Sequence, residues 1–194
     1  MAEQVKGKKV KGQYGYRDYH RKIQLMKVLF GAAMILVQLL ARNFTENQAA
    51  RNVLTLMAIL SVLPTANVAS PLLASWKYKT CSPELFQKTC GLEKTGLLLY
   101  DLIVTSKEMI LPLDVVMVHP NTVVAYCSSP KIDAKKAEKY LNETFQAHRL
   151  DGNVKIISEE RQFVKRVREL KPMGEYEDDG SVEYGAGVLK SLSM

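Results

Sequence analysis

A run of 24 residues without a single charged side chain, Val53–Trp76, constrains this chain more than any other feature. As a helix the run is about 36 Å long, which is enough to cross a hydrocarbon core of roughly 30 Å. Pro64, Asn67 and Pro71 interrupt it. Because freed backbone groups need partners in lipid, these residues favour packing of the later half against another helix.

An earlier apolar run, Ile23–Ala41, reaches spanning length only if Lys27 is included, and a lysine near the end of a span can snorkel to the headgroups. A short linker joins the runs, so two helices here must be antiparallel. We therefore expect a transmembrane hairpin over residues 23–78, with Trp76 and Tyr78 as anchors at the membrane interface. The alternatives are two buried helices of a soluble protein and, less favoured because no A-x-A site follows, a cleaved signal peptide.

The net charge of +7 is concentrated near the start of the chain, since the first 27 residues carry eight basic and two acidic side chains. From Lys77 onward the charges cancel, which is not typical of a nucleic-acid-binding domain. We expect residues 1–22 to be a basic arm on anionic lipid headgroups. The candidate contact residues are Lys6, Lys8, Lys9, Lys11, Arg17, Arg21 and Lys22. Nucleic-acid binding by this arm, with base stacking on its tyrosines, is the less favoured alternative.

The distribution of basic residues also predicts the orientation of the hairpin. The first 27 residues carry eight of them, the linker between the apolar runs only two, and two more follow Trp76 directly. Because basic residues stay on the cytoplasmic side, we expect a two-span membrane protein with both termini in the cytosol.

Residues 80–172 have the patterns of a small water-soluble domain. Ser82-Pro83-Glu84 is a strong helix start, with a cap hydroxyl, a proline and an acidic first turn. Three strands, one helix, one strand and a last helix are expected to follow, over 97–104, 109–118, 122–127, 133–150, 153–157 and 158–170. This order, α-β-β-β-α-β-α, predicts a cytosolic α+β domain. Residues 173–194, acidic and glycine-rich, are expected to be a mobile tail.

This order of elements resembles the core of the restriction-endonuclease-like fold, which includes the nuclease-related domains found beside membrane segments. In that family an acidic residue on the second strand and an acid-x-lysine triplet on the third hold a divalent metal. Asp114 falls on the second strand, so the resemblance makes it the candidate catalytic carboxylate. Ala125 and Cys127 occupy the places of the acid and the lysine, and the resemblance therefore implies a catalytically inactive copy.

No other chemistry is indicated by the sequence. Cys81, Cys90 and Cys127 form no CxxC pair, the three histidines lack metal-ligand spacing, and no nucleophile elbow, P-loop or HExxH pattern is present. We expect no metal, no cofactor and a non-catalytic module that binds a partner at the inner membrane face, a protein or, less favoured, a nucleic acid. Two alternatives remain. One is a divergent nuclease-fold hydrolase with ligands from Glu84 or Glu108, and the other is an accessory subunit of a membrane complex that works through its hairpin.

Overall fold

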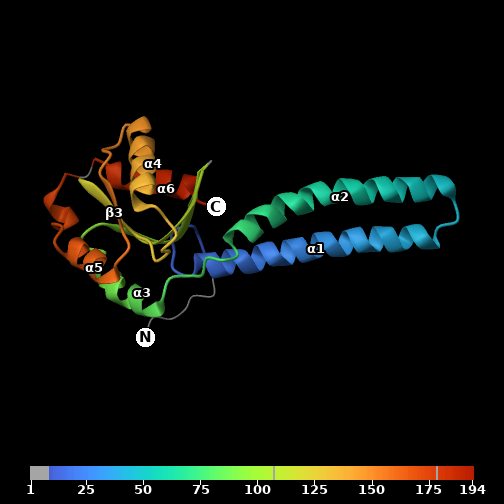
Figure 1. The fold of residues 1–194 in the computed structure, drawn as a ribbon, viewed down its shortest axis with the longest axis horizontal. Helices are drawn as coiled ribbons and strands as arrows, with labels where there is room; N and C mark the ends of the chain where they lie inside the picture. Colours follow the sequence, from blue (N-terminus) through green and yellow to red (C-terminus); the bar gives the residue numbers. More distant parts are fainter. Residues whose placement is uncertain (1–8, 107, 178) are drawn as a thin grey trace. The chain divides into compact units, whose positions relative to one another are not determined.

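The computed structural model describes residues 9–106, 108–177 and 179–194, which form two compact units. One unit is the hairpin, residues 18–79, and the other combines the residues up to Arg17 with residues 80–194. Figure 1 labels the α-helices of both units and strand β3. The basic arm is thus divided at Arg17, and its described part, from Lys9, belongs to the second unit, the α+β domain.

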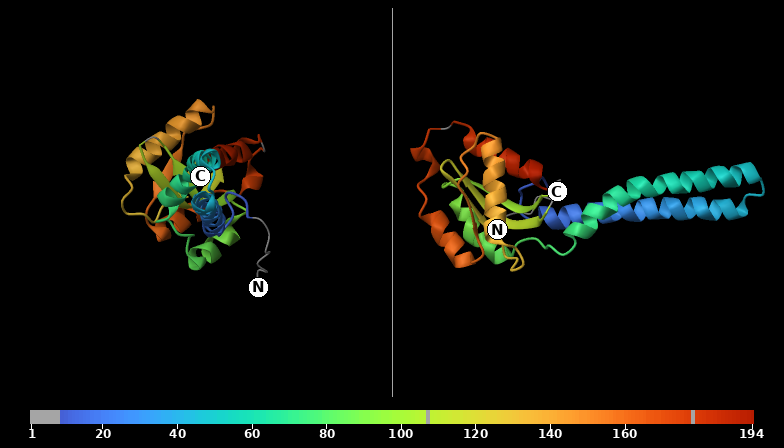
Figure 2. Two further views of the ribbon diagram at one scale, coloured as in Figure 1. Left: turned by 90° about the vertical axis from the view of Figure 1, so that its right-hand side faces the viewer. Right: turned by 45° about the horizontal axis from the view of Figure 1, so that its top comes forward.

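The hairpin consists of α1 (Tyr16–Phe44), whose first two residues belong to the α+β domain, and α2 (Gln48–Ser75), which run antiparallel and side by side (Figures 1 and 2). Both are long and apolar enough to cross a membrane. Asn47 caps α2 by accepting a hydrogen bond from the Ala49 N–H at 2.9 Å. The two prolines lie within α2 without ending it.

The two helices of the hairpin meet through small and polar side chains. A Cβ on Gly31 would lie 2.4 Å from Thr65 Oγ1, so glycine is required for this close approach. Nearer the loop that joins the two helices, Gln38 and Ser61 hydrogen-bond each other at 3.3–3.4 Å. The large apolar side chains instead point outward, as Phe30 and Leu63 show with 70% and 66% exposure.

The α+β domain contains one four-stranded sheet in the order β1-β2-β3-β4. The strands are β1 (Leu97–Thr105), β2 (Ile110–His119), β3 (Thr122–Tyr126) and β4 (Val154–Ile157). The first three are antiparallel neighbours, and β4 joins β3 in parallel after a crossover through α4 (Ala134–Ala147). The class is therefore α+β, as expected.

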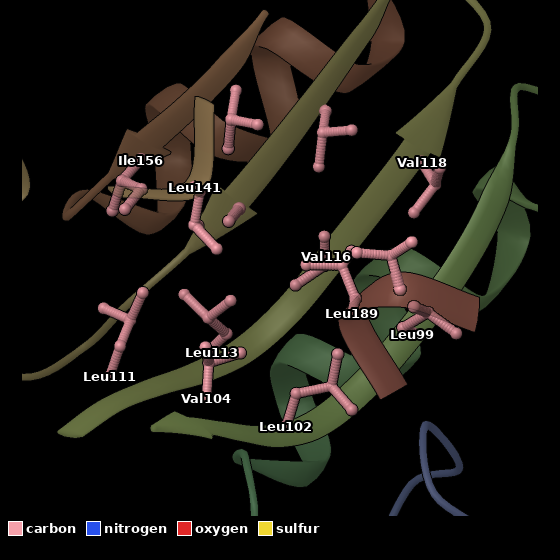
Figure 3. Close-up of a cluster of buried hydrophobic side chains, with 14 of the residues drawn as sticks. Leu99, Leu102, Val104, Leu111, Leu113, Val116, Val118, Leu141, Ile156 and Leu189 are labelled. Atoms are coloured by element: carbon pink, nitrogen blue, oxygen red, sulfur yellow. The ribbon is translucent and has the colours of Figure 1, made fainter. Parts of the chain in front are cut away.

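Helices cover both faces of the sheet, which explains why its strands are nearly continuous apolar runs. The first face packs against α4 and α6 (Ser181–Leu192). Figure 3 shows Leu189 of α6 beside Leu99 of β1 and Val116 of β2, and Leu141 of α4 next to Ile156 of β4. The second face packs against α3 (Pro83–Thr89) and α5 (Glu160–Arg168) through Leu85, Phe163 and Val167. The remaining elements are short 3₁₀ turns, η1 (Cys90–Leu92) and η2 (Met173–Glu175).

Helix α6 lies where the sequence predicted a mobile tail, and that expectation is wrong for residues 181–192. Val182, Ala186 and Leu189 of α6 are at most 5% exposed and belong to the core. They recur at spacings of four and three, the period of one helical face. The acidic, glycine-rich composition of the preceding residues obscured this period, and Gly180, with φ of 72°, turns the chain into the helix.

Both edges of the sheet are covered. The β1 edge is bridged at Tyr100 by Gly12, whose carbonyl accepts the Tyr100 N–H at 2.8 Å, and at Val104 by Ser193. On β4, the outward-facing N–H groups of Val154 and Ile156 donate to the side chains of Asn142 and Glu138, at 2.7 and 2.8 Å. Covered edges do not invite pairing with further strands.

Candidate functional site: a buried arginine–aspartate cluster

Arg17, at the start of α1, is buried in the α+β domain with its side chain only 4% exposed. Its Nη1 donates to Asp114 Oδ1 at 2.7 Å, and its Nη2 donates to the carbonyl oxygens of Leu102 and Leu113 at 2.9 and 2.7 Å. A planar guanidinium suits this arrangement because it directs several donors at once. Arg17 thereby joins β1 to β2 at the same level of both strands.

Asp101 of β1 is the second acidic member of the cluster, and its side chain is fully buried. One carboxylate oxygen accepts the Gly15 N–H at 2.7 Å and the other accepts the Cys81 N–H at 2.9 Å. Arg17 Nε lies 4.0 Å away. Gly15 lies shortly before the hairpin segment 18–79 and Cys81 shortly after it, so a single carboxylate holds the chain near the points where it leaves the domain and returns to it.

The two aspartates lie where the regular alternation of both strands is broken. Residues three apart on a strand normally face opposite sides of the sheet. Here Leu99 and Leu102 pack in the same core cluster. Asp101 has φ of 58°, a conformation that aspartate tolerates better than most side chains. Leu113 and Val116, which lie on either side of Asp114 and are also three residues apart, share the same core cluster. The local shift turns both carboxylates toward Arg17.

Burial raises the pKa of Asp101 above its ordinary value, and the Cys81 N–H, the Arg17 charge and the Gly15 N–H each act in the opposite direction. Burial also raises the pKa of the neighbouring Cys81 thiol to about 12, with smaller contributions from Asp101 and Asp114. This thiol is therefore protonated at neutral pH and is not an activated nucleophile.

Asp114, the carboxylate singled out by the nuclease resemblance, has both oxygens engaged. Oδ1 accepts from Arg17, and Oδ2 accepts the Ser128 N–H at 2.8 Å. Across residues 9–106, 108–177 and 179–194, no group of three or more histidine, cysteine, aspartate or glutamate side chains could hold a metal ion. The carboxylates of Glu84 and Glu108 therefore complete no such group. The cluster holds the chain together and is not arranged as a metal centre.

Two lysines of the arm, Lys9 and Lys11, form hydrogen bonds within the α+β domain. Lys9 Nζ donates to the Tyr14 carbonyl at 2.9 Å, and Lys11 Nζ donates to the carbonyls of Ser193 and Lys190, the latter at 3.5 Å. Tyr14 stacks on Phe86 with ring centroids 4.2 Å apart. This part of the arm is folded onto the domain.

Of the candidate headgroup contacts, Arg17 is a wrong prediction, because a buried and paired guanidinium cannot reach lipid. Because lysines precede and follow Arg17 in the sequence, its side chain was predicted to be solvated. In the fold, Arg17 instead supplies the positive charge opposite the buried carboxylates of Asp101 and Asp114. Lys6 and Lys8 lie outside the described residues. In the hairpin, Arg21 pairs with Asp18 at 3.0 Å and lies over the Trp76 ring at 5.6 Å.

The remaining interface candidates stay accessible. Lys22 and Trp76 are exposed and Tyr78 is half-buried. An indole that is open to its surroundings and carries a cation over one face suits a membrane–water interface, where one part of the side chain is apolar and the other is polar.

Helix α5 provides a second feature on the domain surface. A groove of about 470 Å³ lies along it, lined by Arg161, Val164 and Arg168 together with Lys88 of α3. Lys88 pairs with Glu160 at 2.6 Å. Among the described residues, none forms an ion pair with Arg161 or Arg168. The groove therefore presents two unpaired guanidinium groups, and the rest of its lining is Val164 together with Lys88, Lys165, Glu160 and Glu169.

Comparison with protein-family models, curated proteins and solved structures finds no match to this chain.

The buried arginine–aspartate cluster was not predicted from the sequence, although one signal for it was present. Asp101 and Asp114 each interrupt an apolar strand, and a carboxylate buried in this way requires a cation or several N–H donors.

Proposed function

We propose that this chain is a two-span integral membrane protein whose α+β domain binds a partner at the inner face of the membrane and performs no chemistry. The apolar surface of the hairpin carries this proposal. Leu29, Phe30 and Leu63 are 60%, 70% and 66% exposed, and their neighbours are similar. In water such a surface is an aggregation hazard, whereas in a bilayer it is the surface that a spanning helix needs.

The contacts of the acidic side chains support binding over catalysis. Both oxygens of Asp114 accept hydrogen bonds, one from Arg17 and one from Ser128, and the guanidinium charge beside it disfavours a metal cation at this carboxylate. The arginines of the α5 groove support a partner with acidic side chains, since exposed guanidinium groups pair with carboxylates in two-point geometry. We therefore assign partner binding to the domain and membrane attachment to the hairpin.

Sodium carbonate extraction tests the membrane part of the proposal. The full chain should stay in the membrane pellet, because an inserted hairpin is held by burial of its apolar surface and not by charge. Release into the supernatant would contradict it and would favour the two helices of a water-soluble protein.

A membrane-impermeant maleimide tests the orientation. Cys90 is the exposed cysteine of the domain, and Phe44→Cys in a Cys90→Ser background places a thiol at the far end of α1. In intact cells the Phe44→Cys thiol should react and Cys90 should not. The reverse labelling pattern would show that the domain faces outward.

Incubation of the detergent-solubilised chain with nucleic acid and Mg²⁺ or Mn²⁺ tests the absence of chemistry. We expect no turnover and no metal-dependent rise in thermal stability. Turnover that is lost in Asp114→Asn would overturn the non-catalytic proposal and support the hydrolase alternative.

A second candidate function places the working surface in the hairpin, as an accessory subunit of a membrane complex. One observation favours it: Asn67 of α2 is exposed, and among the described residues none hydrogen-bonds its side chain. Exchange of the hairpin for an unrelated one distinguishes a hairpin that only anchors the chain from a hairpin that contacts other subunits. Proteins that co-purify with the chain in detergent should be retained if the hairpin is only an anchor, and lost if it is the contact surface.

A further inference from the structure

Helix α2 carries a regular seam on the side that does not contact α1. We call it the outer seam, and its members are separated alternately by three and four residues: Val53, Leu56, Leu60, Leu63, Asn67, Ser70 and Ala74. The first six are exposed and Ala74 is half-buried. A spacing that averages 3.5 residues is the repeat by which one helix packs along another with a left-handed crossing.

The outer seam is distinct from the face that packs within the hairpin. The inner face meets α1 through Ser61 and Thr65, which contact Gln38 and Gly31, and it also contains the buried Ala58. Helix α1 therefore covers the inner face of α2 and leaves the outer seam exposed.

Asn67 leaves polar groups unsatisfied in the middle of the outer seam. No described residue hydrogen-bonds its carboxamide, and its backbone carbonyl lacks the usual helical donor because Pro71, four residues on, has no N–H. Ser75 ends α2 eight residues later, so Asn67 lies about 12 Å from that end along the helix. In a bilayer this depth is within the hydrocarbon, where unpaired polar groups are costly.

We infer that the outer seam of α2 is a dimer interface and that a second copy of this chain occupies it, with Asn67 against Asn67. The side chain of Asn67 is complementary to a second copy of itself. A carboxamide has both donors and an acceptor, so two related by a two-fold axis can exchange hydrogen bonds, and the two uncapped carbonyls add further acceptors.

The membrane supplies the required orientation. All copies insert in the same direction, so their α2 helices are parallel, which is the arrangement in which a seam meets itself in register. A single asparagine in such a seam selects register and partner number in helical pairs. Ser70 and Ala74 are small and allow the helices to approach closely beside Asn67.

This inference rests on the proposed membrane insertion of the hairpin, and the experiments separate the two. If carbonate releases the chain, the proposed function fails. If the chain remains inserted but does not self-associate, only the dimer fails.

Energy transfer in vesicles tests self-association. The full chain, labelled at Cys90 with donor or acceptor dyes, is reconstituted in phosphatidylcholine–phosphatidylglycerol vesicles and diluted with lipid. Wild type should show more energy transfer than is expected from randomly distributed chains at the same density in the membrane. Asn67→Leu should weaken association by about tenfold, the effect of losing two hydrogen bonds between membrane helices. Asn67→Gln keeps the carboxamide and should retain part of the association.

Gln38→Leu is the matched control, because it removes an equivalent carboxamide from the inner face and should leave the dilution curve unchanged. Wild type that stays at the random level at every lipid ratio overturns the dimer, whether or not another protein binds the seam. If Asn67→Leu associates as strongly as wild type, Asn67 does not stabilise the dimer.

Cysteine cross-linking tests the register independently, in a Cys90→Ser background. Leu63→Cys lies on the seam and should form a disulfide between copies under mild oxidation. Val62→Cys, also exposed but on a different face of α2, should form little. Equal cross-linking at both positions would contradict a specific interface.

Discussion

Arg17 Nη1 lies 2.7 Å from Asp114 Oδ1, and this ion pair joins residues that are 97 positions apart in the chain. It closes the α+β domain around the point where the hairpin begins. Asp101, which accepts N–H groups from Gly15 and Cys81, holds both flanks of the hairpin segment. Loss of a member of the cluster should therefore destabilise the domain strongly.

Asp114→Ala should destabilise the domain by about 3–5 kcal/mol, because it leaves the Arg17 charge buried without its partner. Unfolding of the full chain in detergent, followed by circular dichroism, measures this. Asp18→Ala is the control, since its pair with Arg21 is partly exposed and should contribute less than about 1 kcal/mol. Similar losses in both variants would contradict the special role of the buried pair.

The pH dependence of stability should reflect the raised pKa of Asp101. The folded protein holds this proton more tightly than the unfolded chain, in which the pKa of an aspartate is near its ordinary value of 3.8. The resulting stability is fully present below that pH and is lost as pH rises through the folded-state pKa. Urea unfolding should therefore show the advantage of wild type over Asp101→Asn shrinking from pH 3.5 to neutrality. An advantage that grows with pH would contradict the raised pKa.

Only one of the three cysteines should react in the native protein. Cys90 is exposed, whereas Cys81 and Cys127 are buried and burial raises the pKa of both thiols. Mass spectrometry after iodoacetamide treatment at neutral pH should find one adduct on the folded chain and three after denaturation. Modification of Cys81 before unfolding would show that the region around Asp101 opens readily.

Leu189→Ala should cost about 2–5 kcal/mol, because this side chain is fully buried between α6 and the sheet. Tyr184→Ala, on the same helix but 52% exposed, is the matched control and should change stability little. Thermal unfolding of the two variants compares them directly. A negligible effect of Leu189→Ala would mean that residues 181–192 do not stay packed in solution.

Gly31→Ala should destabilise the hairpin by about 1–3 kcal/mol, since the added methyl would collide with the Thr65 side chain. Thr65→Ala in the same chain removes the nearest atoms and should restore most of the loss. Thermal melting of the helical signal in detergent reports both. If the second substitution restores nothing, the close approach of the helices is not what requires glycine.

Local patterns predicted those parts of the fold in which a single segment determines its own structure. The Ser82-Pro83 helix start appears in α3, where the Ser82 hydroxyl accepts the Leu85 N–H. Pro112 lies in the part of β2 that has only β1 as a neighbour, because β3 pairs with β2 only from Val115 onward, and a proline in a strand is tolerated where one side needs no N–H. The two apolar runs become two long helices because length and composition alone allow little else.

The sequence by itself determined which segments avoid water and which period they follow, because hydrophobicity and helical spacing are properties of neighbouring residues. Only the tertiary structure decided what Arg17 and Asp101 do, since a charge among lysines or leucines acquires its role from partners brought close by folding. The same is true of α6, whose apolar stripe became part of the core because β1 and β2 present it with an apolar face.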